Sequence, residues 1–125
     1  MAKSNRESLG ERQLRAPMLS FSINEEIEKL LKEPGWLNGD RNAVTLQKNP
    51  KLRVVLISLR KGASLLEHKV EGPITVLVLS GNINFIIGDD KVNAKANGMI
   101  VLEKTIPHDV EALEDSTFIL TIIQP

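Results

Sequence analysis

The segment from Gly62 to Gly81 reads GASLLEHKVEGPITVLVLSG and decides the fold of this 125-residue chain. It holds two short runs rich in leucine, valine and isoleucine, separated by Gly72-Pro73, a pair with the dihedral preferences of a tight turn. Runs of this length and composition predict strands, here over residues 65–70 and 74–79. The first of them carries His68, and the chain has two histidines in all.

The same alternation of short apolar runs and turn residues continues on both sides of this segment. From residue 43 onward the turns recur about every ten residues, which is typical of an all-β sandwich or barrel, and we expect that barrel to occupy about residues 43–123. Several runs, such as Val54–Ile57, are apolar on both faces, so their outer face should be covered by a helix or by a second subunit. The other expected strands are residues 43–46, 52–59, 83–87, 91–94, 99–102, 110–112 and 117–123.

The part of the chain before the barrel divides into an arm and a helix. Residues 1–17 are polar and are expected to form a flexible arm. Ser22 and Glu25 have the spacing of a capping box, and apolar residues then recur at helical spacing. This pattern predicts one short amphipathic helix over about residues 23–32, within a single domain that spans residues 18–125.

A second segment, GMIVLEKTIPH, runs from Gly98 to His108 and ends forty residues after the first histidine. It resembles the second motif of the cupin family shortened by one residue, while Gly62, His68 and Gly81 have the spacing of the first cupin motif. The resemblance covers about residues 52–123. It implies an all-β fold, the double-stranded β-helix or jelly-roll barrel of small RmlC-like cupins, with the short helix added at its N-terminal side.

The resemblance also shows where the chain departs from a metal-binding cupin. Carried over position by position, the family's four metal-ligand positions fall on His68, Val70, Ile74 and His108. Valine and isoleucine cannot donate an electron pair, so two histidines leave a divalent metal short of ligands unless Glu103 or water completes the set. We expect either no required cofactor or a labile divalent transition metal on His68 and His108, with Glu103 as a third ligand. The alternative is a neutral polar histidine pair at the barrel mouth.

An apolar barrel with a few polar groups at its mouth is suited to a small organic ligand. Three functions stay open: small-molecule binding without a required metal, a metal-dependent enzyme of the dioxygenase or isomerase type, and a structural oligomeric barrel with a filled interior. The loss of two metal-ligand positions to aliphatic residues favours the first, and no catalytic residue is identified. The residues expected to line the pocket are His68, Val70, Ile74, Val76, Phe85, Glu103 and His108.

The amino-acid composition limits which binding partners and which cellular compartment we expect. Lysine plus arginine equals aspartate plus glutamate at 16 each, so no net charge draws the chain to nucleic acid or to an anionic membrane. The chain lacks cysteine and begins without an apolar signal segment, which together favour the cytoplasm. The expected partners are a small organic ligand and a second copy of the chain in a homodimer.

The single tryptophan, Trp36, follows Pro34-Gly35 directly after the expected helix. A tryptophan at such a position most often packs a helix end onto the rest of the domain. We therefore expect Trp36→Ala to act mainly on stability.

Overall fold

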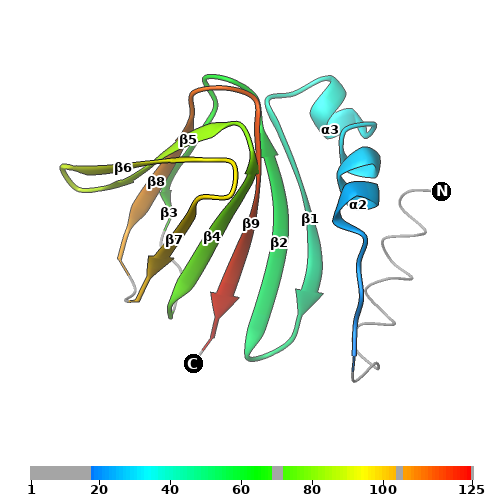
Figure 1. The fold of residues 1–125 in the computed structure, drawn as a ribbon, viewed down its shortest axis with the longest axis horizontal. Coiled ribbons are helices and arrows are strands. Elements are labelled where there is room, and N and C mark those ends of the chain that lie inside the picture. The colour runs from blue at the N-terminus through cyan, green and yellow to red at the C-terminus, as the bar shows by residue number, and fades with distance from the viewer. Residues whose placement is uncertain (1–17, 69–71, 104–105, 125) are drawn as a thin grey trace.

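The computed structural model describes residues 18–68, 72–103 and 106–124, with only the backbone of Glu67 and His68, and they form two antiparallel sheets packed face to face (Figure 1). The five-stranded sheet has the order β1-β2-β9-β4-β7 and the four-stranded sheet the order β3-β8-β5-β6. Strands that are neighbours in a sheet are mostly distant in sequence, as in a jelly roll. The strands are β1 (Arg41–Lys48), β2 (Leu52–Leu59), β3 (Ser64–His68), β4 (Ile74–Ser80), β5 (Asn82–Ile87), β6 (Asp90–Lys95), β7 (Met99–Leu102), β8 (His108–Ala112) and β9 (Ser116–Ile123).

This architecture confirms the predicted all-β jelly-roll barrel. Every predicted strand is present, and the strand ends predicted within the described residues are displaced by two residues or fewer. The arm predicted over residues 1–17 lies outside the described residues, and so does Val70.

The main core lies between the two sheets. Along β4 the side chains of Ile74, Val76 and Val78 are buried and their neighbours are half-buried, because successive side chains of a strand point to opposite faces. They pack against Phe85 of the smaller sheet and Phe118 of the larger one. Each such side chain contributes roughly 1.5–3 kcal/mol when buried, so this apolar interior holds the two sheets together.

Helix α2 (Ile23–Leu30) covers the outer face of β1 and β2. It begins at Ser22, whose side-chain oxygen accepts a hydrogen bond from the backbone N–H of Glu25 at 3.4 Å. Leu30 packs on Leu46 of β1 and Leu56 of β2 in a second, smaller core. The helix therefore covers the apolar outer face of these strands, as the sequence predicted.

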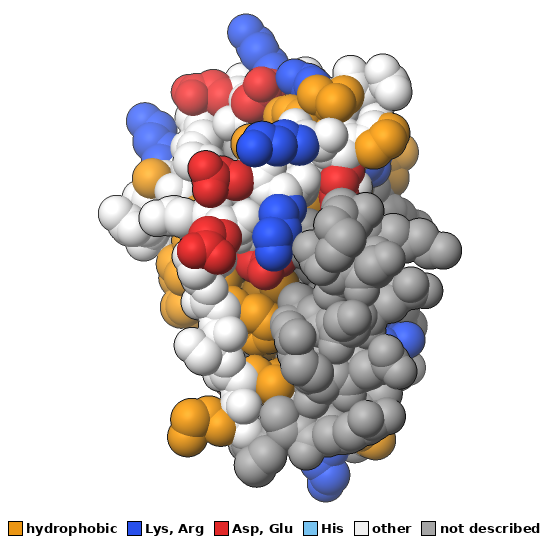
Figure 2. Space-filling model, turned by 90° about the vertical axis from the view of Figure 1, so that its right-hand side faces the viewer, with side chains coloured by type: hydrophobic (Ala, Val, Ile, Leu, Met, Phe, Trp, Pro, Cys, Tyr) orange, Lys and Arg blue, Asp and Glu red, His pale blue; other side chains and the backbone are white. Residues whose placement is uncertain are grey.

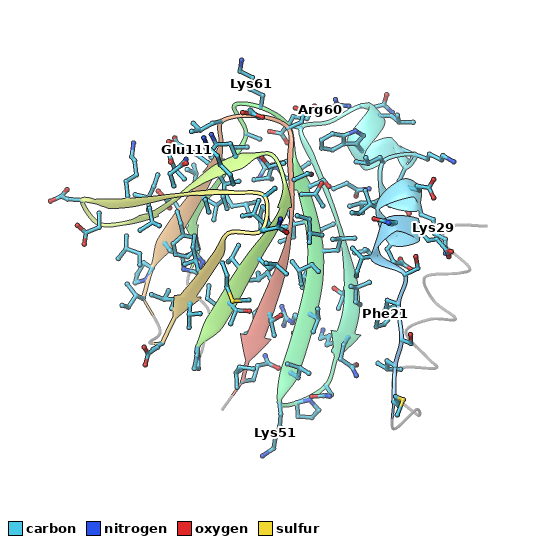
Figure 3. All side chains as sticks on the ribbon, in the orientation of Figure 1. Phe21, Lys29, Lys51, Arg60, Lys61 and Glu111 are labelled. Carbon is cyan, nitrogen blue, oxygen red and sulfur yellow. The ribbon has the colours of Figure 1, made fainter. Side chains whose placement is uncertain are left out.

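The opposite face of this helical region is polar. In Figure 3, Phe21 lies on the side toward β1, whereas Lys29 points away from the sheet. Figure 2 shows the same side of the molecule, where basic and acidic side chains are interspersed in its upper part. None of the helices that the structure describes has the length and apolar character needed to cross a membrane.

A second helix, α3 (Pro34–Leu37), follows where the sequence predicted only a stop, so the expected single helix over residues 23–32 is corrected to two. Proline is tolerated in the first turn of a helix, where its missing N–H has no partner to lose. Trp36 is 9% exposed, and the guanidinium of Arg60 lies 4.1 Å from its ring centroid. Trp36 thus packs against the barrel, as its position in the sequence suggested.

Candidate functional site

A cavity of about 360 Å³ lies between the two sheets. Most of its lining is apolar and comes from seven strands, β1 to β5, β8 and β9. Its volume falls within the range of small-molecule sites, which are also mainly apolar with a few polar groups. The described residues that line it are Arg41, Asn42, Ala43, Ile57, Leu65, Val76, Phe85, His108, Val110, Phe118 and Leu120.

His108 is the first residue of β8 and faces the cavity. Its side chain is only 6% exposed, and its ring stacks on Phe85 with the centroids 4.9 Å apart and the planes inclined by 18°. Nδ1 donates a hydrogen bond to the carbonyl oxygen of Ile106 at 3.1 Å. Since a carbonyl oxygen can only accept, this bond places a proton on Nδ1 and makes Nε2 the acceptor in the neutral ring.

The backbone brings the two histidine positions together. His68 on β3 and His108 on β8 are directly opposite in the antiparallel ladder, where Cα atoms lie about 4.5–5.5 Å apart. Between Leu65 and His68 the register shifts, so three residue steps on β3 match two on β8. This bulge is what aligns His68 with His108, and bulges often occur beside functional sites.

Among the described residues, the donor set around these positions does not fit a divalent metal. Ile74, at one of the family's ligand positions, is 1% exposed in the core and has no lone pair to donate. Glu103 is exposed and is not among the described residues lining the cavity. Within the described part of the chain, no three or more His, Asp or Glu side chains gather where they could hold a metal ion. Val70, at the remaining position, lies outside the described residues.

Arg41, at the start of β1, carries the one charged side chain among the described lining residues. Its Nε and Nη2 donate to the two carboxylate oxygens of Asp40 at 2.8 and 2.9 Å, and its Nη1 donates to the carbonyl oxygen of Ser64 at 2.9 Å. The hydrogen bond from Arg41 is the main influence on Asp40 and holds the pKa of that carboxyl below its ordinary value. Because β1 and β3 are edge strands of different sheets, this side chain bridges the two sheets at the edge of the cavity.

Asn42 contributes to the lining but its amide is already engaged. Nδ2 donates to the carbonyl oxygen of Leu30 and to the carboxylate of Glu33, both at 2.9 Å. These bonds tie the end of α2 to β1 and satisfy a carbonyl that a helix end leaves without a partner in the helix. Arg41 has five N–H groups, of which its bonds to Asp40 and Ser64 use three, so Arg41 and His108 are the polar lining side chains that suit a ligand.

The structure brings part of the sequence-based set together. Val76, Phe85 and His108 line the cavity, whereas Ile74 belongs to the core beside it and Glu103 lies at the surface. The side chain of His68 lies outside the described part of the chain. The other lining residues, on β1, β2, β3, β8 and β9, were not predicted. Period-two alternation in the last strand was a usable signal for Phe118 and Leu120, while no local pattern marks Arg41.

Solved structures with the same architecture are numerous. A conserved protein of unknown function from Streptococcus pyogenes is 27% identical, over 68% of this chain and 75% of its own, with a TM-score of 0.65. A cupin 2 conserved barrel domain protein from Leptotrichia buccalis is 30% identical, over 69% of this chain and 42% of its own, with a TM-score of 0.65. An RmlC-like cupin protein from Desulfovibrio desulfuricans is 20% identical, over 86% and 90% of the two chains, with a TM-score of 0.61.

No protein-family model matches the sequence, and no curated protein matches it. The likeness is therefore carried by the three-dimensional fold.

Proposed function

We propose that this chain, which has the fold of the small cupins, binds a small, mainly apolar organic molecule in the cavity between its sheets. The single observation that carries the proposal is the cavity itself, about 360 Å³ and lined mainly by aliphatic and aromatic side chains. A barrel that served only as a scaffold would be filled by its own side chains at this place.

The polar end of the proposed site is His108. Its ring faces the cavity and its Nδ1–H is held by the carbonyl oxygen of Ile106, which fixes the imidazole as the polar group at this end of the site. Stacking on Phe85 fixes the plane of the ring, which lowers the entropy cost of orienting a ligand. His68, opposite on the neighbouring strand, is the proposed second polar group.

The test is a titration with the neutral fluorescent probe N-phenylnaphthylamine. The wild-type chain should bind about one molecule with increased fluorescence. Ala43→Phe should abolish saturable binding, because Ala43 lies on the edge strand β1 with an exposed side chain that lines the cavity. Thr45→Phe is the matched control: Thr45 is exposed on the same strand two residues on, and it is not among the described lining residues.

Two outcomes would count against this function. A wild-type chain that shows no saturable fluorescence change has no usable cavity. A probe that binds Ala43→Phe as tightly as the wild type is bound elsewhere on the molecule.

The metal-dependent enzyme remains the alternative, and the donor set argues against it. We propose that the chain needs no divalent metal, since only His68 and His108 carry donors among the four family positions. Metal analysis after purification without chelators should find less than about a tenth of an equivalent. A stoichiometric metal that is lost in His108→Ala would favour the enzyme instead.

Two further proposals concern the setting of the protein. We propose a homodimer, because large apolar side chains such as Met99 and Val101 stay 58% and 59% exposed. Light scattering after size exclusion should then give twice the chain mass of 13.9 kDa.

We also propose that the protein is located in the cytoplasm, since a chain without cysteine suits a reducing compartment.

A further inference from the structure

The side chains at the edge of the cavity indicate the chemical class of the ligand. Arg41 presents a planar fork of donors there, and the fork already holds a carboxylate: Asp40 accepts from Nε at 2.8 Å and from Nη2 at 2.9 Å. Asp and Glu side chains are absent from the described lining. A guanidinium in this geometry recognises planar carboxylates through two parallel hydrogen bonds, which a lysine ammonium cannot do.

The position of the guanidinium is fixed by the fold. Its Nη1 donates to the carbonyl oxygen of Ser64 at 2.9 Å, which ties it to the first residue of β3. Three of its five N–H groups are used by Asp40 and Ser64 in these bonds. The side chain is 42% exposed, so a ligand at the cavity edge can reach it without opening the barrel.

Arg41 and His108, the two polar groups of the site, lie at two different levels along the strands of the smaller sheet. Ser64, which holds Arg41, pairs with Glu111 on β8, and His108 lies three residues before Glu111 on the same strand. Three strand residues span on the order of 10 Å. Between these levels Leu65 and Val110 form an apolar wall.

We propose, resting on the small-molecule function above, that the ligand is an elongated monocarboxylate whose acid group binds Arg41 while its apolar body lies along the wall toward His108. In that case the carboxylate of Asp40 and the carboxylate of the ligand compete for the guanidinium of Arg41. Loss of the Asp40 charge should strengthen binding of a carboxylate ligand, and loss of the Arg41 charge should weaken it.

The experiment compares two ligands of nearly equal shape, octanoate and octanamide, as competitors of bound N-phenylnaphthylamine at neutral pH and low salt. In the wild type, octanoate should displace the probe at a concentration about threefold to tenfold lower than octanamide, a modest factor because Arg41 is partly exposed. The preference should shrink as salt is added, since exposed charges are screened.

The variants test the assignment to Arg41. Arg41→Gln should bring the ratio of the two competitors close to one, mainly because octanoate then needs a higher concentration to displace the probe. Arg41→Lys, which keeps the charge without the fork, should give an intermediate ratio. Asp40→Asn should raise the ratio above that of the wild type. Asp89→Asn removes the same charge in the exposed turn after β5 and should leave the ratio unchanged.

The results separate the two proposals. If the probe itself does not bind, the small-molecule function fails. If the probe binds but octanoate and octanamide displace it equally, the carboxylate assignment is wrong while the function stands. A preference that persists in Arg41→Gln, or that falls in Asp40→Asn, also overturns the role of Arg41.

Discussion

The imidazole of His108 and the phenyl ring of Phe85 form a stacked pair, 4.9 Å between centroids, on adjacent strands of the smaller sheet. The pair faces the cavity and closes part of its wall. His108, which the sequence predicts as a metal ligand or as a polar group at the barrel mouth, therefore also contributes to packing. Substitutions at this position can separate the two roles.

The first prediction concerns that pair. His108→Ala should lower the free energy of unfolding by about 2 kcal/mol, from the lost stacking and the buried volume left empty. His108→Phe keeps a ring against Phe85 and gives up the hydrogen bond to Ile106, so it should cost only about 1 kcal/mol. Urea unfolding measures both. Equal losses in the two variants would mean that the polar contact, and not the stacking, holds the ring.

The second prediction concerns Trp36. Its indole is 9% exposed, lies under the guanidinium of Arg60 at 4.1 Å, and is not among the described cavity-lining residues. Trp36→Ala should lower the free energy of unfolding by about 3 kcal/mol and leave probe binding unchanged under conditions where the chain is folded. Trp36→Phe is the control, which keeps most of the buried area. A selective loss of probe binding in Trp36→Ala would show that α3 shapes the cavity.

The strands could be predicted from the sequence because their signals are local. Alternating apolar residues and Gly, Pro or Asx turns mark each strand within a few residues, and strands such as β2 and β7 match the expected bounds throughout. Helix α3 was missed for an equally local reason. Pro34-Gly35 is a common helix stop, and the short turn that follows depends on the packing of Trp36, which sequence alone does not show.

The site was harder to predict because it depends on pairing between distant segments. Arg41 lies just before the expected strand, and its place at the cavity follows from β1 and β3 being edge strands of different sheets. The bulge before His68 is likewise invisible in the sequence, yet it sets the register with His108. Inward residues of predicted strands, such as Val76 and Phe85, needed only the alternation and were identified.

The third prediction concerns acid stability. The hydrogen bond from Arg41 lowers the pKa of Asp40 in the folded chain, so the ionised carboxylate stabilises the fold above the unfolded-state pKa of about 3.9. That stabilisation is lost as the pH falls through the folded-state pKa. The wild type should therefore exceed Asp40→Asn in stability by a small, constant amount near neutral pH. The difference should begin to shrink as the pH falls below about 4 and should vanish only below the folded-state pKa of Asp40.

The control for this pH effect removes the partner. In an Arg41→Gln background, Asp40→Asn should no longer change the pH dependence of urea unfolding. A difference that persists without Arg41, or that grows as the pH falls, would assign the effect to another group.

The last prediction compares two glycines of the segment that decided the fold. Gly62 and Gly81 both have positive φ values, 89° and 92°, where a residue with a Cβ costs roughly 1–2 kcal/mol. A Cβ on Gly62 would meet nothing within 4 Å, so Gly62→Ala should cost only this strain. A Cβ on Gly81 would press on the carbonyl oxygen of Asp115 and come within 2.6 Å of the Cα of Ser116.

Both atoms at Gly81 belong to the backbone of the turn before β9, and they cannot turn aside as a side chain can. The Oγ of Ser116 also accepts from the backbone N–H of Asn82 at 2.9 Å, so a shifted turn loses that bond as well. Gly81→Ala should therefore cost roughly 4 kcal/mol, at least twice the loss in Gly62→Ala. Urea unfolding of the two variants side by side gives the comparison. Equal losses of unfolding free energy in the two variants would mean that the turn relaxes around the added methyl group. Gly81, like Gly62, would then be required only for its backbone conformation.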